Sequence, residues 1–152
     1  MRGVTCLVTG ATSGIGEHTA YGLARLGATV LMVVRDAERG AAVAADIRTV
    51  VPQGTVELFV ADLAVQAEVR TLAADVTDRH PRLDVLINNA AAVNAEHRLT
   101  GDGIEATLAV NHLAPFLLTH LLLEPLTAAL AARVITVSSY MHQRVKTIPG
   151  TT

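Results

Sequence analysis

The sequence has little net charge, a single cysteine and no long uninterrupted apolar run. Its 12 basic and 14 acidic residues leave a formal net charge of −2, so there is no basic field to attract nucleic acid or an acidic membrane. One cysteine, Cys6, excludes an intramolecular disulfide. The most apolar stretch, from Phe116 to Leu126, contains His120, Glu124 and Pro125 and is too short to cross a bilayer.

Targeting and metal-binding patterns are also lacking. A strand-like run starts at Gly3, and it is not preceded by the charged segment and the longer apolar segment that form a signal peptide. We therefore expect a cytoplasmic protein. The six histidines show no metal-ligand spacing, so we expect no metal site. Cys6 lies within an apolar run, which favours a small core residue over a reactive thiol.

The composition is that of a folded domain. Hydrophobic residues make up 51% of the chain and charged residues 17%, which is too apolar for a disordered protein. A length of 152 residues can bury a sizeable core. No repeat, linker or low-complexity tract is visible, so residues 1–152 are predicted to form a single domain.

Short apolar runs alternate with segments of helical periodicity. Strands are predicted at residues 4–8, 29–34, 55–61, 84–88 and 133–138, and helices at 14–26, 36–50 and 65–79. Gly27 ends the first helix and Asp36 can cap the second. Residues 90–103 are predicted to be a loop running into a helix near Asp102, and 113–131 a long helix kinked at Pro125.

This alternation predicts an α/β fold. Strands that are apolar throughout belong to a parallel sheet covered by helices on both faces. Right-handed crossovers then give a Rossmann-type doubly wound sheet of strand order 3-2-1-4-5. Ligands of such sheets bind at the carboxyl ends of the strands, where the first and fourth strands diverge.

A glycine-rich turn follows the first predicted strand. Residues 9–16 read TGATSGIG, with glycines at Gly10, Gly14 and Gly16. Glycine permits a tight turn and a close approach of the backbone to a pyrophosphate, and the next helix offers free N–H groups to that anion. Thr12 and Ser13 can add hydroxyl donors. The alternative is an ordinary strand-to-helix turn.

The turn and four later motifs resemble the short-chain dehydrogenase/reductase family. TGATSGIG is similar to the family's TGxxxGIG fingerprint, Asp62-Leu63 to its adenine-contacting pair, and residues 88–91 (NNAA) to its NNAG motif. Asn111 resembles its catalytic-helix asparagine, and residues 138–139 its serine pair. The resemblance implies that Ser139 and Asn111 are catalytic. It implies a cofactor site made of Gly10, Thr12, Ser13, Gly14, Ile15, Gly16, Arg35, Asp62, Leu63, Asn89, Ala90 and Ala91.

Residues 110–126, VNHLAPFLLTHLLLEPL, narrow the resemblance further. They are similar to the subgroup that contains retinol dehydrogenases and the WW-domain oxidoreductase. This implies hydride transfer between a nicotinamide and a small apolar carbonyl or alcohol substrate. His112 and His120 lie eight residues apart at the long predicted helix, where packing or solvent contact explains them better than metal binding.

The end of the second strand bears on the choice of cofactor. An acid there would bond the ribose 2′-hydroxyl of NAD and repel the 2′-phosphate of NADP. That position falls on Val34, and Arg35 follows, whose guanidinium can pair with a phosphate. We therefore expect NADP rather than NAD. Asp36 keeps NAD open as the alternative, because a shift of one residue would bring an acid into the site.

The family's tyrosine and lysine are missing from the expected place. In the family a tyrosine donates the proton, and a lysine four residues later lowers the pKa of that tyrosine. The tyrosine position falls at or beyond Thr152, the last residue, so we expect an amino-terminal part without the later strands and helix. Tyr140 with Arg144 spells YxxxR, but Tyr140 adjoins the serine and is a poor substitute. A fifth strand without a further neighbour is an open edge, which favours self-association.

Three hypotheses therefore follow. The first is an NADP-dependent oxidoreductase that is incomplete in this chain. The second is a non-catalytic module that holds a cofactor or a partner chain. The third, some other α/β nucleotide-binding domain, is disfavoured by the ordered matches at Asn89, Asn111 and Ser139.

Overall fold

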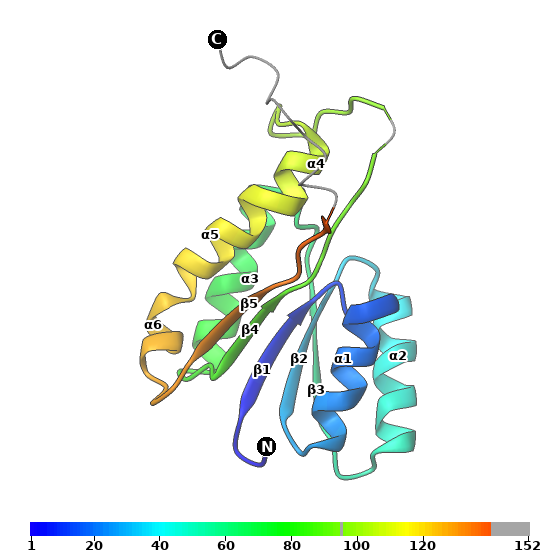
Figure 1. The fold of residues 1–152 in the computed structure, drawn as a ribbon, viewed down its shortest axis with the longest axis vertical. Coiled ribbons are helices and arrows are strands. Elements are labelled where there is room, and N and C mark those ends of the chain that lie inside the picture. Colours follow the sequence, from blue (N-terminus) through cyan, green and yellow to red (C-terminus); the bar gives the residue numbers. More distant parts are fainter. Residues whose placement is uncertain (95, 141–152) are drawn as a thin grey trace.

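Five parallel strands form one sheet in the computed structural model, which describes residues 1–94 and 96–140. The strand order is β3-β2-β1-β4-β5, so the predicted α/β doubly wound topology is confirmed (Figure 1). The strands are β1 (Thr5–Thr9), β2 (Thr29–Val34), β3 (Thr55–Val60), β4 (Val85–Asn88) and β5 (Arg133–Thr136).

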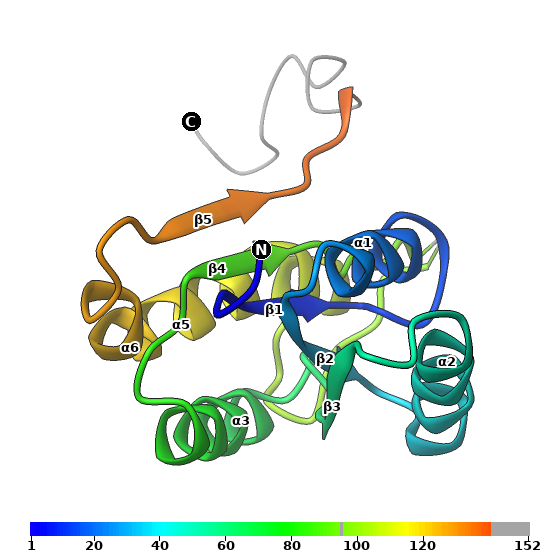
Figure 2. The same cartoon turned by 90° about the horizontal axis from the view of Figure 1, so that it is seen from below.

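Helices cover both faces of the sheet (Figure 2). The first face packs against α1 (Gly14–Arg25) and α2 (Ala37–Val50), and the second against α3 (Gln66–Arg79), α5 (Ala114–Leu121) and α6 (Leu123–Thr127). Within the described residues, no helix combines the length and hydrophobicity that a membrane span requires.

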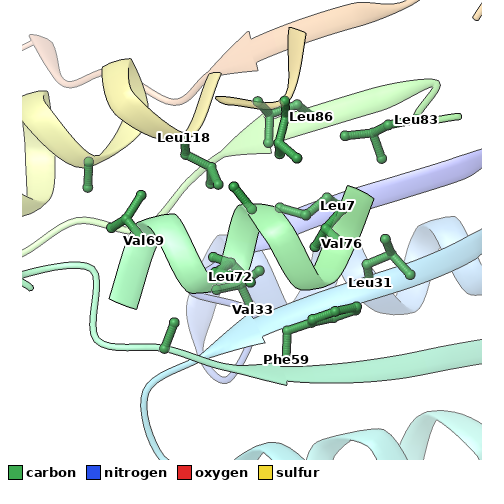
Figure 3. Packing of buried hydrophobic residues seen from close by; sticks show 14 of the residues in the cluster. Leu7, Leu31, Val33, Phe59, Val69, Leu72, Val76, Leu83, Leu86 and Leu118 are labelled. Carbon is green, nitrogen blue, oxygen red and sulfur yellow. The ribbon is translucent and has the colours of Figure 1, made fainter. Parts of the chain in front are cut away.

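The strands bury side chains on both faces, as continuous apolar runs predict. Leu7, Leu31 and Leu86 face α3 and α5 (Figure 3), whereas Cys6 and Val30 face α1 and α2. All five have no exposed surface. Burial raises the pKa of the Cys6 thiol to about 11, so the thiol stays protonated near neutral pH. Cys6 is thus a core residue, as predicted.

Two of the expected helix boundaries are confirmed by their end groups. The Asp36 carboxylate accepts a hydrogen bond of 3.0 Å from the Arg39 N–H and so caps α2. Gly27 follows α1 with a φ of +84°, a left-handed conformation that favours glycine. These local signals are readable because each depends on neighbours in the sequence.

The long helix predicted over residues 113–131 is wrong in its extent. The chain forms a π-helical turn, η1 (Ala109–Leu113), then α5 and α6, which end at Leu121 and Thr127. Pro125 has no N–H to donate to the carbonyl of Leu121, and α5 ends at that residue. The predicted break is therefore confirmed, but it divides the segment into two helices.

The helix expected near Asp102 begins later. Residues 101–104 form turns, and α4 (Ala106–Leu108) starts after Glu105. The Glu105 carboxylate accepts hydrogen bonds from the N–H groups of Thr107 and Leu108, at 2.9 and 2.8 Å. These two bonds lower the pKa of Glu105 and set the start of α4.

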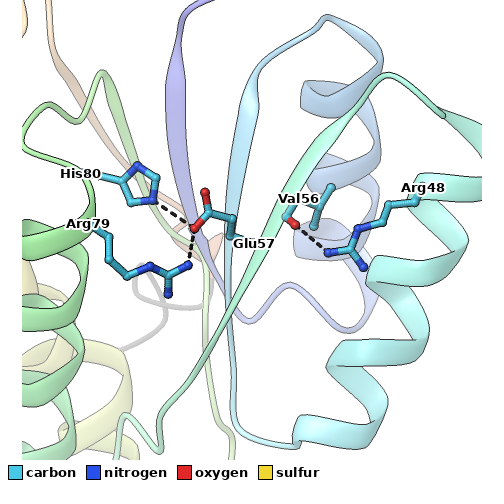
Figure 4. A network of polar contacts seen from close by, with 5 residues as sticks. All are labelled: Arg48, Val56, Glu57, Arg79 and His80. Carbon is cyan, nitrogen blue, oxygen red and sulfur yellow. Dashed lines mark hydrogen bonds and ion pairs between the residues drawn. The ribbon is translucent and has the colours of Figure 1, made fainter.

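Polar contacts from both layers hold the edge strand β3 (Figure 4). From α2, Arg48 donates a 2.7 Å hydrogen bond to the Val56 carbonyl. On the other face, Glu57 pairs with Arg79 and lies 3.2 Å from the His80 ring nitrogen. The Arg79 guanidinium also lies 4.5 Å from the centre of the Phe59 ring, a favourable cation–π distance.

Candidate functional site

A cavity of about 330 Å³ lies at the carboxyl ends of the central strands. This is where the strand order predicts a ligand, because β1 and β4 diverge there. Its wall comes from the carboxyl-terminal end of β2, from the segments that follow β1, β2, β3 and β4, and from η1. The lining residues are Gly10, Thr12, Ser13, Val33, Val34, Arg35, Ala61, Asp62, Leu63, Asn89, Ala90, Ala91, Ala92 and Val110.

Most of the cofactor residues expected from the sequence meet at this cavity. Of the twelve, nine line it, and they come from the glycine turn, the end of β2, the end of β3 and the segment after β4. Gly14, Ile15 and Gly16 are outside its described wall. Gly14 and Ile15 lie on the exposed first turn of α1, directly after Ser13.

Gly16 has a packing role beneath the turn. A Cβ at this position would lie 2.3 Å from the Gly10 carbonyl oxygen and 2.4 Å from the Asn89 side-chain nitrogen. Gly10 is equally constrained, since its φ is +68° and a Cβ would lie 2.9 Å from the Ala90 Cα. Both glycines are therefore required by close contact between the turn and the segment after β4.

A buried hydroxyl joins the ends of β1 and β4. Thr9 Oγ1 accepts hydrogen bonds from the N–H groups of Asn89 at 3.0 Å and Ala90 at 2.9 Å. In return, the Asn89 side chain donates to the Thr9 carbonyl at 2.9 Å and, more weakly, to that of Gly10 at 3.4 Å. This network sets the distance between two walls of the cavity.

The two residues after β2, Arg35 and Asp36, carry opposite charges. Arg35 lines the cavity, whereas the carboxylate of Asp36 caps α2. Of these two neighbours in the sequence, Arg35 therefore lines the cavity and Asp36 does not. Asp62 also lines the cavity, and its carboxylate accepts a 2.9 Å hydrogen bond from the Ala64 N–H.

Asn111 lies on the π-helical turn η1 and clamps the segment after β4. Its side chain accepts a 2.7 Å hydrogen bond from the Ala92 N–H and donates one of 2.8 Å to the Ala92 carbonyl. The side chain thus positions Ala92, which lines the cavity, relative to η1. π-Helical turns occur often at functional sites.

Asn111 also borders a second, more apolar groove between η1, α5 and β5. This groove has a volume of about 450 Å³. Asn88 lies in its floor, with its side chain buried and donating a 3.1 Å hydrogen bond to the Thr119 hydroxyl. His112 and His120 border the same groove. Within the described part of the chain, no three histidine, cysteine or acidic side chains gather as a metal site would need.

Ser139 follows the end of β5 by three residues and is exposed. The pairing of β5 with β4 continues to Val137, whose N–H donates a 2.9 Å hydrogen bond to the Asn88 carbonyl. The described walls of the cavity and of the apolar groove do not include Ser139. The structure therefore places Ser139 after the strand expected to carry it, at the same end of the sheet as the cavity.

Neither tyrosine has the environment of an activated proton donor. Tyr140 is 72% exposed, and Arg144 lies outside the described residues. Tyr21 lies on α1 and packs against the core beneath α1 and α2. Desolvation and the Asp46 and Glu17 carboxylates raise the pKa of Tyr21, which opposes proton transfer near neutral pH.

Some residues of the site carried no clear sequence signal. Ala92 and Val110 line the cavity but are small apolar residues in irregular or helical segments. Thr9 was visible only as the first letter of the glycine turn. Its bonds to Asn89 and Ala90 join residues about 80 positions apart in the sequence, so no local pattern reveals them.

Known proteins are similar in sequence to this chain over most of its length. A family model described as short chain dehydrogenase matches residues 4–148. Dehydrogenase/reductase SDR family member 13 of Bos taurus is 45% identical over 144 residues, which cover 95% of this chain and 38% of that protein. Retinol dehydrogenase 13 of Homo sapiens is 43% identical over 140 residues, which cover 92% of this chain and 42% of that protein.

Solved structures share the fold. A metagenomic short-chain oxidoreductase in complex with NADP superposes with a TM-score of 0.80 and 34% identity. The match covers 91% of this chain and 63% of that one. The present chain thus spans about two fifths of the length of the curated relatives it matches.

Proposed function

Since this chain belongs to the short-chain dehydrogenase family, we propose that its cavity binds NADP and forms the cofactor site of an oxidoreductase. The observation that carries the proposal is that the two charged residues after β2 have different contacts. Arg35 lines the cavity, and the neighbouring Asp36 carboxylate is engaged as a helix cap. A cavity with a guanidinium and no acid from β2 suits a 2′-phosphate.

The residues present fit the parts of such a cofactor. Thr12, Ser13 and the first turn of α1 would hold the pyrophosphate, because the Ser13 side chain makes no capping hydrogen bond and the helix dipole favours an anion. Arg35, Asp62 and Leu63 would hold the adenosine end. The remaining lining residues, Asn89, Ala90 and Ala91, would lie along the rest of the cofactor. Bound NADP supplies or accepts the hydride.

Ser139 and Asn111 are the catalytic candidates of this chain. By its place after β5, the Ser139 hydroxyl would hold the substrate oxygen, and the Asn111 side chain would position Ala92 against the cofactor. The sequence contains no tyrosine followed four residues later by a lysine. The alternative is therefore a chain that binds the cofactor without completing the reaction. Oxidation of an alcohol by the isolated 152 residues would exclude this alternative.

A small apolar alcohol or carbonyl compound is the proposed substrate class. Two observations support it: the relatives include retinol dehydrogenase 13, and an apolar groove adjoins Asn111. A cytoplasmic location, and the lack of nucleic-acid or membrane partners, stay predictions from composition.

Arg35→Ala is predicted to weaken NADPH binding about tenfold to a hundredfold, while NADH binding changes little. The reason is the loss of charge-assisted hydrogen bonds to the 2′-phosphate. Isothermal titration calorimetry with both cofactors measures the effect. Arg39→Ala is the matched control, because Arg39 is an exposed arginine on the first turn of α2. Equal affinity of the wild type for NADPH and NADH would contradict the choice of NADP.

Self-association through β5 is also proposed. Within the described residues β5 pairs only with β4, and Val134, Ile135 and Val137 are 47%, 45% and 38% exposed. An apolar strand with one free edge can pair with another chain. Sedimentation velocity of the 152 residues should show an average mass that rises with concentration, and Ile135→Lys should reduce it. A monomer at all concentrations would refute this proposal.

A further inference from the structure

A smaller cavity adjoins the cavity proposed to bind NADP, on the side of Arg35 and Asp62. Its volume is about 210 Å³, and it shares Arg35, Asp62, Ala92 and Val110 with the larger cavity. The two cavities therefore adjoin each other along these four residues, and together they are called the hollow. Beyond these four residues, the smaller cavity is lined by the segment after β3 and by a loop before α4 that brings Arg98 to its wall.

Hydrogen bonds hold the loop that contains Arg98 against the rest of the fold. The Arg98 carbonyl accepts a 2.8 Å hydrogen bond from the Ala106 N–H at the start of α4. Leu99 and Glu105 form an isolated antiparallel β-bridge. At the tip of the loop, the Asp102 carboxylate accepts a 2.9 Å hydrogen bond from the Gln66 N–H at the start of α3. The loop is thus attached at both its base and its tip.

The acidic and basic side chains around this hollow differ in their hydrogen bonding within the protein. Each nearby aspartate already accepts a backbone hydrogen bond: Asp36 from Arg39, Asp62 from Ala64, and Asp102 from Gln66. Among the described residues, neither Arg35 nor Arg98 has an ion pair or side-chain hydrogen bond. Two guanidinium groups from segments about 60 residues apart in the sequence therefore border one hollow without an internal partner. This arrangement suits a phosphate, which guanidinium groups bind in bidentate fashion.

We propose that Arg98 acts together with Arg35 in binding the 2′-phosphate of NADP. This inference rests on the proposed function, since the cofactor must lie in the larger cavity with its adenosine toward Asp62. Arg35 comes from the end of β2, and Arg98 from the loop before α4. The preference for NADP would then depend on a loop distant from β2 in the sequence, as well as on the residue after β2.

The test compares two nucleotides that differ only in the 2′-phosphate, 2′,5′-ADP and 5′-AMP. Isothermal titration calorimetry measures their dissociation constants for the wild type, Arg98→Ala, Arg35→Ala and Arg70→Ala. Arg70 is an exposed arginine on α3 outside the described walls of both cavities, so it controls for loss of one charge. Arg98→Ala should weaken 2′,5′-ADP binding about tenfold and leave 5′-AMP binding unchanged. Arg70→Ala should change neither.

The possible outcomes distinguish a failure of the role proposed for Arg98 from a failure of the proposed NADP site. If the wild type prefers 2′,5′-ADP and Arg98→Ala binds it as tightly as Arg70→Ala does, the role of Arg98 is refuted and the NADP site stands. If Arg98→Ala weakens both nucleotides equally, Arg98 contacts the adenosine and the proposal of a phosphate contact is refuted. If the wild type binds neither nucleotide, the proposed NADP site itself fails, and the inference fails with it.

Discussion

Gly16→Ala is expected to destabilise the protein by about 3 kcal/mol or more and to abolish cofactor binding. The added methyl group would lie 2.3 Å from the Gly10 carbonyl oxygen and 2.4 Å from the Asn89 side-chain nitrogen. The first of these is backbone and the second is hydrogen-bonded to the Thr9 carbonyl, so neither can move without breaking the turn. Urea denaturation measures the free energy of unfolding.

Gly22→Ala is the matched control for this substitution. Gly22 lies on the same helix, α1, and a Cβ there meets no atom within 4 Å. Alanine lowers the conformational entropy of the unfolded chain, so this variant should be as stable as the wild type or more stable by about 0.5–1 kcal/mol. Equal stability of the two variants would show that the turn does not pack against Asn89 as described.

Thr9→Val should cost about 2–3 kcal/mol of stability, although valine has nearly the shape of threonine. The substitution removes the acceptor of two backbone N–H groups, those of Asn89 and Ala90, at 3.0 and 2.9 Å. Thr9 is buried, and a donor that loses its partner away from water bears its full desolvation cost. Because the same bonds set the wall of the cavity, cofactor affinity should fall as well.

Thr5→Val separates this effect from strand propensity. Thr5 lies on the same strand, β1, and its hydroxyl makes no hydrogen bond to another described residue. Chemical denaturation of both variants should show a change within about 0.5 kcal/mol for Thr5→Val. If Thr9→Val is equally mild, the Thr9 hydroxyl does not hold the two segments together.

The fold was predictable because its signals are local. Short apolar runs such as those in β2 and β4, separated by helices, predict a parallel sheet without knowledge of the tertiary contacts. Asp36 and Gly27 mark helix ends through neighbours within four residues. The extent of the last helices was not predictable to the same degree. Segments α4, η1, α5 and α6 form one apolar stretch in which the position of each break depends on backbone hydrogen bonding.

The sequence indicated where a site would form, and the roles of its residues stay predictions. Nine of the twelve residues that the resemblance implied for the cofactor line one cavity of the structure. The sequence did not reveal that Gly16 packs against Asn89, that Asn111 holds Ala92, or that Arg98 lines the same smaller cavity as Arg35. Each of these contacts joins segments 19 or more residues apart in the sequence, so the folded chain was needed to find them.

NADP is proposed to occupy the cavity between the glycine turn and Arg35. Titration of ¹⁵N-labelled protein with NADP, followed by amide chemical shifts, tests it most directly. We predict the largest shifts at residues of the cavity wall, including Ser13, Arg35, Asp62 and Ala91. No shifts at millimolar NADP, or shifts confined to the apolar groove around Phe116 and Leu123, would contradict the account.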